Sequence, residues 1–322
     1  MTSVIRIGFT GAVGSYSEAA VRALYAGHAA FKGCALETVS FETDHQLFEA
    51  VRSQKVDQAI TPIENSLSGT LHEILSALID TRDVPRLCIA AEFIFHEPHQ
   101  LLGLPGATTS GARQVVSHDH VLAQCDEYLD AVLPKHNASG SGCQRVMVSS
   151  TGEAAELVRA LNDKSVLCVA GHTAAAIYGL VPVAVDTDEQ RAQQTRIETH
   201  ADSSFTRFWL LAREDLVAPV ERHQEPKTSL GLRTQNRPGA LHRILSCFAL
   251  RNINVYKIES RPQPRSILRP HAAWSYDMYI DFEGAPSVDA SVARALDNVR
   301  EFSTEVVVLG SYPRYVFDEQ LW

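Results

Sequence analysis

The sequence predicts a mixed α/β protein with more than one domain, and three observations support this. The chain has 322 residues, 45% hydrophobic and 21% charged, which suffices for two or three domains with ordinary cores. Short apolar runs alternate with amphipathic segments over the first two-thirds, as is typical of a sheet with parallel neighbouring strands. Residues 228–322 instead follow the order β-α-β-β-α-β, which is the ferredoxin-like order.

The first region is expected to alternate strands and helices, apart from successive strands near its middle. An apolar strand at 4–9 leads through a Gly-rich turn into a helix at 16–26. Further strands are expected at 37–41, 58–63, 86–95, 99–104, 145–150 and 165–171, and further helices at 44–52, 70–79, 151–161 and 172–180. The segment 113–129 is predicted to be a strand, a turn and a helix.

The C-terminal region begins after a charged, proline-containing linker at 216–227. Strands are expected at 228–234, 253–261, 272–282 and 305–311, with helices at 237–252 and 287–299. A proline-broken loop at 262–271 would join the two middle strands.

Composition excludes several classes of function. A net charge of -9 and a pI near 5.8 argue against a nucleic-acid or anionic-membrane surface. No apolar stretch reaches membrane-spanning length, and the N-terminus lacks a signal sequence, so we expect a soluble cytoplasmic protein. None of the six cysteines forms a CxxC pair, which predicts buried free thiols and no zinc site.

Four turns rich in Gly, Ser, Thr or His are each predicted to join a strand to a helix: "TGAVGSYSE", "PIENSLSGTLHE", "VSHDH" and "SSTGEAA". Backbone N–H groups at such helix starts bind carboxylates or phosphates well. The alternatives are plain caps and solvated turns; Ser15 and Glu18, for example, have capping-box spacing. The glycines at 8, 11 and 14 do not form G-x-G-x-x-G, and no Walker, nucleophile-elbow or HExxH motif occurs, so no cofactor or metal is predicted.

The stretch "SSFTRFWLLAR" places Thr206 and Arg207 between two phenylalanines and ahead of an apolar run. A surface ion pair plus a strand hydroxyl is the structural interpretation of this pair. The functional interpretation is a polar group at the edge of a cleft. By strand alternation, Phe205 and Phe208 are expected to pack into the core.

Taken in order, these motifs resemble those of the prephenate dehydratases, and arogenate dehydratases are the close relatives. The resemblance rests on "GAVGSYSEAA", "PIENSLSGTLHEIL", "VVSHDHVLAQCDEYL", "HTAAAIYGL" and "FTRFWLLAR". The C-terminal "RPGALHRILSCFALRNINVYKIESRP", with "YIDFEG" and "VLGSYP", is similar to their ACT regulatory domain.

The resemblance implies a two-lobed catalytic region, 1–215, similar to type II periplasmic binding proteins, and an ACT domain at 228–322. One lobe would comprise about 1–80 and 182–215, and the other about 81–181. The implied reaction needs no cofactor: prephenate loses its ring hydroxyl and its ring carboxylate and becomes phenylpyruvate. The leaving hydroxyl needs a hydrogen-bond donor, and the pyruvyl carboxylate must be held in place.

Site residues follow from the resemblance as hypotheses. Thr206 would donate to the leaving hydroxyl, and Arg207 would clamp a carboxylate or organise Glu64. Contacts to substrate, or support for Thr206, are expected from the remaining residues, which are Asn65, Ser66, Ser15, Tyr16, Ser17, His118 and Phe205. The family usually has Asn where this chain has Ser204, so a direct contact from that position stays open.

The ACT resemblance implies phenylalanine as allosteric effector and a homodimer or homotetramer formed through this domain. The expected effector site comprises Asn236, Pro238, Gly239, Ala240, Leu241, Glu259 and Ser260. Pro238 and Gly239 start a helix whose free N–H groups could accept a carboxylate. Two alternatives stay open: an arogenate dehydratase, and a non-enzymatic amino-acid sensor.

Overall fold

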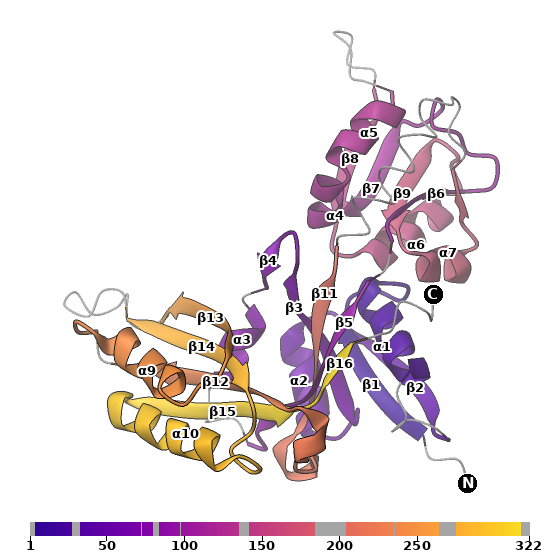
Figure 1. The fold of residues 1–322 in the computed structure, drawn as a ribbon. Helices are drawn as coiled ribbons and strands as arrows, with labels where there is room; N and C mark the ends of the chain where they lie inside the picture. Colours follow the sequence, from indigo (N-terminus) through magenta and orange to yellow (C-terminus); the bar gives the residue numbers. More distant parts are fainter. Residues whose placement is uncertain are drawn as a thin grey trace. The chain divides into compact units, whose positions relative to one another are not determined.

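The computed structural model describes residues 4–27, 33–71, 73–79, 84–96, 98–134, 142–183, 204–234, 236–263 and 275–316. The chain forms two compact units. The first unit comprises Met1–Ala50, Ala59–Leu71 and Ile94–Phe208, and the second comprises Val51–Gln58, His72–Phe93 and Trp209–Trp322. Three β-sheets organise these units (Figure 1).

The largest sheet has seven strands in the order β16-β5-β11-β3-β1-β2, with β4 paired to β3 (Figure 1). Its strands are β1 (Val4–Thr10), β2 (Ala35–Phe41), β3 (Gln58–Asn65), β4 (Gly69–Thr70), β5 (Leu87–Phe95), β11 (Thr206–Arg213) and β16 (Arg314–Val316). The helices in these parts of the chain are α1 (Tyr16–Gly27), α2 (Asp44–Arg52) and α3 (Glu73–Ile79). β1 and β2 are parallel, as predicted. The apolar run of β11 is buried from Phe208 to Ala212, as expected for a strand covered on both faces.

The second sheet has five strands in the order β10-β6-β9-β7-β8. They are β6 (Gln100–Gly103), β7 (Gln114–His118), β8 (Gln144–Val148), β9 (Val166–Ala170) and β10 (Val181–Pro182). The helices α4 (Asp119–Gln124), α5 (Asp126–Val132), α6 (Thr151–Leu161) and α7 (His172–Tyr178) accompany them. β7 runs parallel to β8 and β9, and α4, α6 and α7 follow β7, β8 and β9 directly. Helix N-termini therefore gather at the carboxyl ends of three adjacent strands.

The third sheet has four antiparallel strands in the order β13-β14-β12-β15. They are β12 (Lys227–Arg233), β13 (Val255–Pro262), β14 (Tyr276–Glu283) and β15 (Glu305–Tyr312), with helices α9 (Ala240–Ala249) and α10 (Ala290–Phe302). Leu230, Ile280 and Phe248 belong to one buried core with residues of α10. The element order is the predicted β-α-β-β-α-β, so the α/β fold class with a ferredoxin-like C-terminal part is confirmed.

Two segments differ from the prediction. The turn after β3 does not lead directly into a helix: β3 continues through Asn65 and pairs with β4 in a short hairpin, and the expected helix begins only at Glu73. The expected linker holds the 3-10 helix η3 (Arg222–Gln224), following η2 (Glu214–Leu216), and its last residue, Lys227, already begins β12 and is buried. Most of the predicted loop at 262–271 lies outside the described residues.

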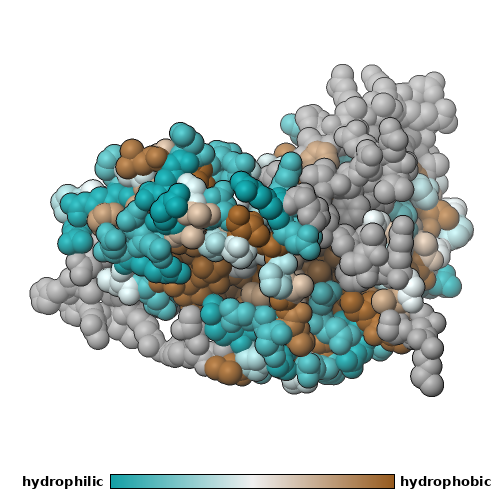
Figure 2. Space-filling model, turned by 60° about the horizontal axis from the view of Figure 1, so that its bottom comes forward, coloured by the Kyte–Doolittle hydropathy of each residue, from teal (hydrophilic) through white to brown (hydrophobic). Residues whose placement is uncertain are grey.

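The surface mixes hydrophilic and hydrophobic residues; in Figure 2 the hydrophobic ones stand singly or in small groups between hydrophilic ones. Among the described helices, none is long and apolar enough to cross a membrane. All six cysteines are free thiols, and five are buried while Cys34 is half-buried. Burial raises the pKa of Cys125 and Cys168 to about 12, so both stay protonated at neutral pH.

Candidate functional site

The predicted polar pair lies at the start of β11, next to the end of β3 in the sheet order. The Asn65 side-chain nitrogen donates to the Thr206 hydroxyl oxygen at 3.1 Å and to the Ser204 hydroxyl oxygen at 3.1 Å. The structure therefore brings Asn65, Thr206 and Ser204 together. Ser204, the position that departs from the family pattern, is in hydrogen-bond contact with this group.

The orientation of the Asn65 amide is set by the backbone that follows it. Its oxygen accepts N–H bonds from Leu67 at 2.9 Å and Ser68 at 3.1 Å. Because both donors are main-chain amides, the acceptor must be the oxygen, and the NH₂ group must face the two hydroxyls. Thr206 thus receives a hydrogen bond at its oxygen, and its own hydroxyl hydrogen can point elsewhere.

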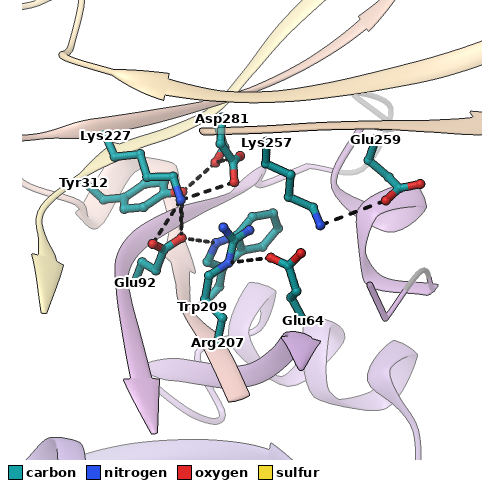
Figure 3. Close-up of polar contacts among 10 residues, drawn as sticks. Glu64, Glu92, Arg207, Trp209, Lys227, Lys257, Glu259, Asp281 and Tyr312 are labelled. Carbon is teal, nitrogen blue, oxygen red and sulfur yellow. Dashed lines mark hydrogen bonds and ion pairs between the residues drawn. The ribbon is translucent and has the colours of Figure 1, made fainter. Parts of the chain in front are cut away.

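Glu64 and Ser66 flank Asn65 and also contact the start of β11. The Arg207 Nε atom lies 3.5 Å from a Glu64 carboxylate oxygen, and the two side chains are 14% and 32% exposed (Figure 3). Ser66 binds the Phe205 backbone twice: its N–H donates to the Phe205 carbonyl at 2.9 Å, and its hydroxyl accepts the Phe205 N–H at 2.9 Å. These contacts fix the backbone of Phe205, the residue before Thr206.

Phe205 does not pack into the core as predicted. Its side chain is 39% exposed and lies against the His96 ring, with centroids 5.1 Å apart, whereas Phe208 is 1% exposed. The two phenylalanines are three positions apart, so they cannot lie on the same face of a regular strand.

The first turn differs from the predicted capping box. Ser15 is 4% exposed, and its hydroxyl has no hydrogen-bond partner among the described residues. The Glu18 carboxylate accepts the Gly14 N–H at 2.7 Å, which Gly14 directs inward by its φ of 81°. A Cβ added to Gly152, at the start of α6, would lie 2.5 Å from the Val13 carbonyl, so this turn packs closely against α6.

Tyr16 and Ser17 complete the first turn. Ser17 is half-buried. The Tyr16 hydroxyl lies 2.5 Å from Nδ1 of His99, and the two rings stack with centroids 5.4 Å apart. His99 Nε2 in turn lies 2.8 Å from the side-chain oxygen of Gln124.

His118 is the last residue of β7 and the N-cap of α4, and it contacts its own neighbours. Its Nδ1 atom lies 2.8 Å from an Asp119 carboxylate oxygen and accepts the His120 N–H at 3.4 Å. Burial lowers the pKa of His118 below its usual 6.5; Asp119 opposes this effect and His120 adds to it. No hydrogen bond joins His118 to the Asn65–Thr206 group within the described chain.

A pocket of about 360 Å³ lies in the second unit, at the N-terminus of α9. The lining residues are Thr234, Asn236, Arg237, Gly239, Ala240, Leu241, His242, Tyr276 and Met278. Four of the seven predicted effector residues are among them; Pro238, Glu259 and Ser260 are not. The described residues contain no cluster of three His, Cys, Asp or Glu side chains suited to a metal ion.

A buried charge cluster, which the sequence did not indicate, also lies in the second unit. The Lys227 ammonium lies 2.8 Å from the nearer Glu92 oxygen and 3.3 Å from an Asp281 oxygen (Figure 3). The indole N–H of Trp209, on β11, donates to Glu92 at 3.3 Å. The three charged residues are at most 4% exposed.

Sequence reasoning missed two residues that the structure brings to the site, His99 and Gln124. Gln124 Nε2 donates to the Asn65 oxygen at 3.4 Å. Gln124 stands in the segment "VVSHDHVLAQCDEYL", so that motif did contain a signal. His99 had none, because it lies in an ordinary apolar strand pattern.

Comparison with known proteins places these features in context. A family model described as prephenate dehydratase matches residues 7–216. "Arogenate dehydratase/prephenate dehydratase 1, chloroplastic" of Arabidopsis thaliana is 35% identical over 319 residues, covering 97% of this chain and 72% of its own.

Several solved structures match over almost the whole chain, among them the following two. Prephenate dehydratase in complex with L-Phe from Arthrobacter aurescens is 27% identical, with a TM-score of 0.74, and the match covers 96% of this chain and 90% of that one. A structure described as GqqA, a novel type of quorum quenching acylase, is 28% identical, with a TM-score of 0.72 and coverages of 96% and 98%.

Proposed function

Because the chain belongs to the prephenate dehydratase family, we propose that it converts prephenate to phenylpyruvate, carbon dioxide and water. The observation that carries this proposal is the Asn65–Thr206 hydrogen bond of 3.1 Å. Since Asn65 donates to the Thr206 oxygen, the hydroxyl hydrogen of Thr206 is available for a substrate oxygen.

The reaction makes limited demands on the protein. The C–C bond to the ring carboxylate breaks, its electron pair enters the ring, and the ring hydroxyl leaves, taking up one proton to become water. A hydrogen bond from Thr206 stabilises the negative charge that develops on the leaving oxygen. The Asn65 donor strengthens this effect, because a hydroxyl that accepts a hydrogen bond becomes a better donor.

Arg207 and Glu64 have a supporting role in this proposal. Their 3.5 Å ion pair favours the hypothesis that Arg207 organises Glu64. A direct carboxylate clamp by Arg207 would use the guanidinium nitrogens other than the Nε atom that faces Glu64. Tyr16 and His118 remain proposed substrate contacts, whereas the burial of Ser15 argues against a direct contact there.

The test is to incubate the purified protein separately with prephenate and with arogenate, and to measure phenylpyruvate and phenylalanine. We expect phenylpyruvate to form from prephenate. If phenylalanine forms from arogenate and no phenylpyruvate forms from prephenate, the arogenate dehydratase alternative is supported. Because GqqA is described as a quorum quenching acylase, the same preparation is assayed for acylase activity. Turnover of neither cyclohexadienyl substrate would overturn the proposal.

We also propose that phenylalanine binds the pocket at the start of α9. The Gly239 residue before α9 has a φ of 78°, and the N–H groups of the first helical turn suit a carboxylate. The Arthrobacter aurescens relative is described as a complex with L-Phe, which supports phenylalanine as the ligand. Calorimetry with phenylalanine tests it, and the absence of heat at millimolar ligand would contradict it.

A homodimer through the four-stranded sheet is proposed as well. β13 is an edge strand, and its Tyr256 and Ile258 side chains are 41% and 45% exposed. Light scattering of wild type and of a Tyr256→Asp, Ile258→Asp double variant tests this assembly. A mass that does not change between the two proteins would contradict it.

A further inference from the structure

A chain of side-chain hydrogen bonds continues from the Asn65–Thr206 group through two residues that carry no assigned role. Gln124 Nε2 lies 3.4 Å from the Asn65 oxygen, and the Gln124 oxygen lies 2.8 Å from Nε2 of His99. His99 Nδ1 lies 2.5 Å from the Tyr16 hydroxyl. The series of hydrogen bonds thus runs Tyr16–His99–Gln124–Asn65–Thr206, and all five residues belong to the first unit.

The donor at each step can be worked out from the Asn65 end. The Asn65 oxygen accepts two backbone N–H groups, so Gln124 must present its NH₂ group there and its oxygen to His99. His99 must then carry its proton on Nε2. In a neutral imidazole this leaves Nδ1 as the acceptor, and Tyr16 donates to it.

His99 is held in this state by its surroundings. The residue is 8% exposed, and the Tyr16 ring stacks on it with an interplanar angle of 23°. In the other tautomer, His99 Nε2 and the Gln124 oxygen would be two acceptors facing each other. Gln124 would have to turn and would direct its own oxygen at the Asn65 oxygen, which would push Asn65 away from Thr206.

We propose that His99 is a positioning residue for the dehydration: held as the neutral Nε2–H tautomer by Tyr16, it orients Gln124 and thereby keeps the Asn65 donor on Thr206. His99 acts through Gln124 and Asn65, and it touches neither Thr206 nor a reacting atom. The inference rests on the proposed function, because it assigns Thr206 as the donor to substrate.

Kinetics of three variants test this role. His99→Phe keeps a ring against Tyr16 but removes both hydrogen bonds, and we expect kcat to fall about 10- to 100-fold with KM nearly unchanged. His99→Gln keeps one donor and one acceptor, and should recover most of the loss. His45→Gln is the matched control, because His45 is an exposed histidine on α2. Wild-type kcat in His99→Phe would overturn the proposal.

Nitrogen NMR of histidine-labelled protein tests the tautomer without any assay of activity. The His99 signals are assigned by their loss in His99→Gln, and we expect a neutral ring protonated on Nε2 at neutral pH. In Tyr16→Phe, the signals should shift toward a mixture of tautomers. A ring protonated on Nδ1, or a charged ring, in the wild type would overturn the proposal even if His99→Phe fails to fold.

The two proposals fail in different ways. If the wild type turns over neither prephenate nor arogenate, the proposed function is wrong whatever the tautomer. If the wild type is active but His99→Phe is equally active, only the role of His99 is wrong.

Discussion

At the scale of single residues, the donor and acceptor roles around Thr206 determine what the site can do. The Asn65 oxygen accepts the N–H groups of Leu67 and Ser68 and a weaker bond from Gln124, so the NH₂ end of the amide faces Thr206. The amide is therefore a fixed donor, and Thr206 is the acceptor that it polarises. This arrangement depends on one nitrogen atom.

Replacing that nitrogen by oxygen gives the first prediction. Asn65→Asp keeps the shape and the two backbone bonds, but Thr206 would then donate to the introduced carboxylate and lose its free hydrogen. We expect kcat to fall about 100-fold or more, with a melting temperature close to wild type. Ser204→Ala is the control, since it removes the other hydroxyl bound to Asn65 and should cost far less activity. Equal losses in the two variants would contradict this account.

A second prediction concerns His118. Burial lowers its pKa below 6.5, while Asp119 at 2.8 Å raises it, so Asp119→Asn should lower the pKa further. A depressed histidine pKa means that the folded state resists protonation. Its contribution to stability is therefore present above pH 6.5 and decreases as pH falls through the folded-state pKa. Proton NMR titration of both proteins measures the two values; a higher pKa in the variant would refute the assignment.

The sequence predicts the residues of the site better than their contacts. Thr206 and Arg207 are recognisable because a polar pair interrupts an apolar strand. His99 is not, because its partner Tyr16 is 83 positions away and only folding brings the two together. The Ser15–Glu18 capping box follows from spacing alone, and it fails because Gly14 turns its N–H toward Glu18 instead.

At the scale of secondary-structure elements, the order of strands and helices is predictable from the sequence, but the residues at which each element begins and ends are not. The expected strands and helices of the first region are present in the expected order, with most ends within two or three residues of the prediction. The β3–β4 hairpin escapes prediction because "ENSLSG" contains the same small polar residues that cap helices. Lys227 falls within the predicted linker because a lysine next to a proline rarely begins a buried strand.

The burial of Lys227 gives the third prediction, on stability. Its ammonium lies between the Glu92 and Asp281 carboxylates, at 2.8 and 3.3 Å (Figure 3). Lys227→Met removes the positive charge of this cluster and leaves two carboxylates buried, so we expect a loss of about 3–5 kcal/mol in the free energy of unfolding.

Lys257→Met on β13 is the matched control for this measurement. Lys257 pairs with Glu259 at 4.0 Å, with side chains 16% and 21% exposed, and such a pair contributes about 1 kcal/mol or less. Urea denaturation of the three proteins compares the two losses. The account fails if Lys227→Met is no less stable than Lys257→Met.

At the scale of the whole molecule, two of the three charged residues of the cluster, Lys227 and Asp281, lie on strands that also lead to the α9 pocket. β12 begins with Lys227 and leads to Thr234, which lines the pocket; β14 carries Met278 of the pocket and Asp281 of the cluster. Glu92 accepts the indole N–H of Trp209, which stands three residues after Thr206 on β11. A ligand that shifts β12 or β14 would therefore act on a network bonded to the strand of Thr206.

The last prediction tests whether this network carries the effector response. The Tyr312 hydroxyl lies 2.5 Å from the Ser229 hydroxyl and donates to Glu92 at 3.5 Å. The Ser229 hydroxyl in turn donates to Asp281 at 2.6 Å. Tyr312→Phe removes this link while keeping the ring in the core. We expect the change in turnover caused by saturating phenylalanine to shrink toward none, with the Kd for phenylalanine nearly unchanged when substrate is absent.

Ser311→Ala provides the comparison, because Ser311 bonds Thr228 at 2.8 Å between the same two strands, outside the cluster. It should keep the full response to phenylalanine. Linkage requires that the effect be reciprocal, so a substrate analogue should alter phenylalanine affinity in wild type and in Ser311→Ala, but not in Tyr312→Phe. Calorimetry with and without the analogue measures this coupling directly. If all three proteins show the same coupling, effector binding reaches the catalytic strand by a route that does not include the Tyr312 hydroxyl.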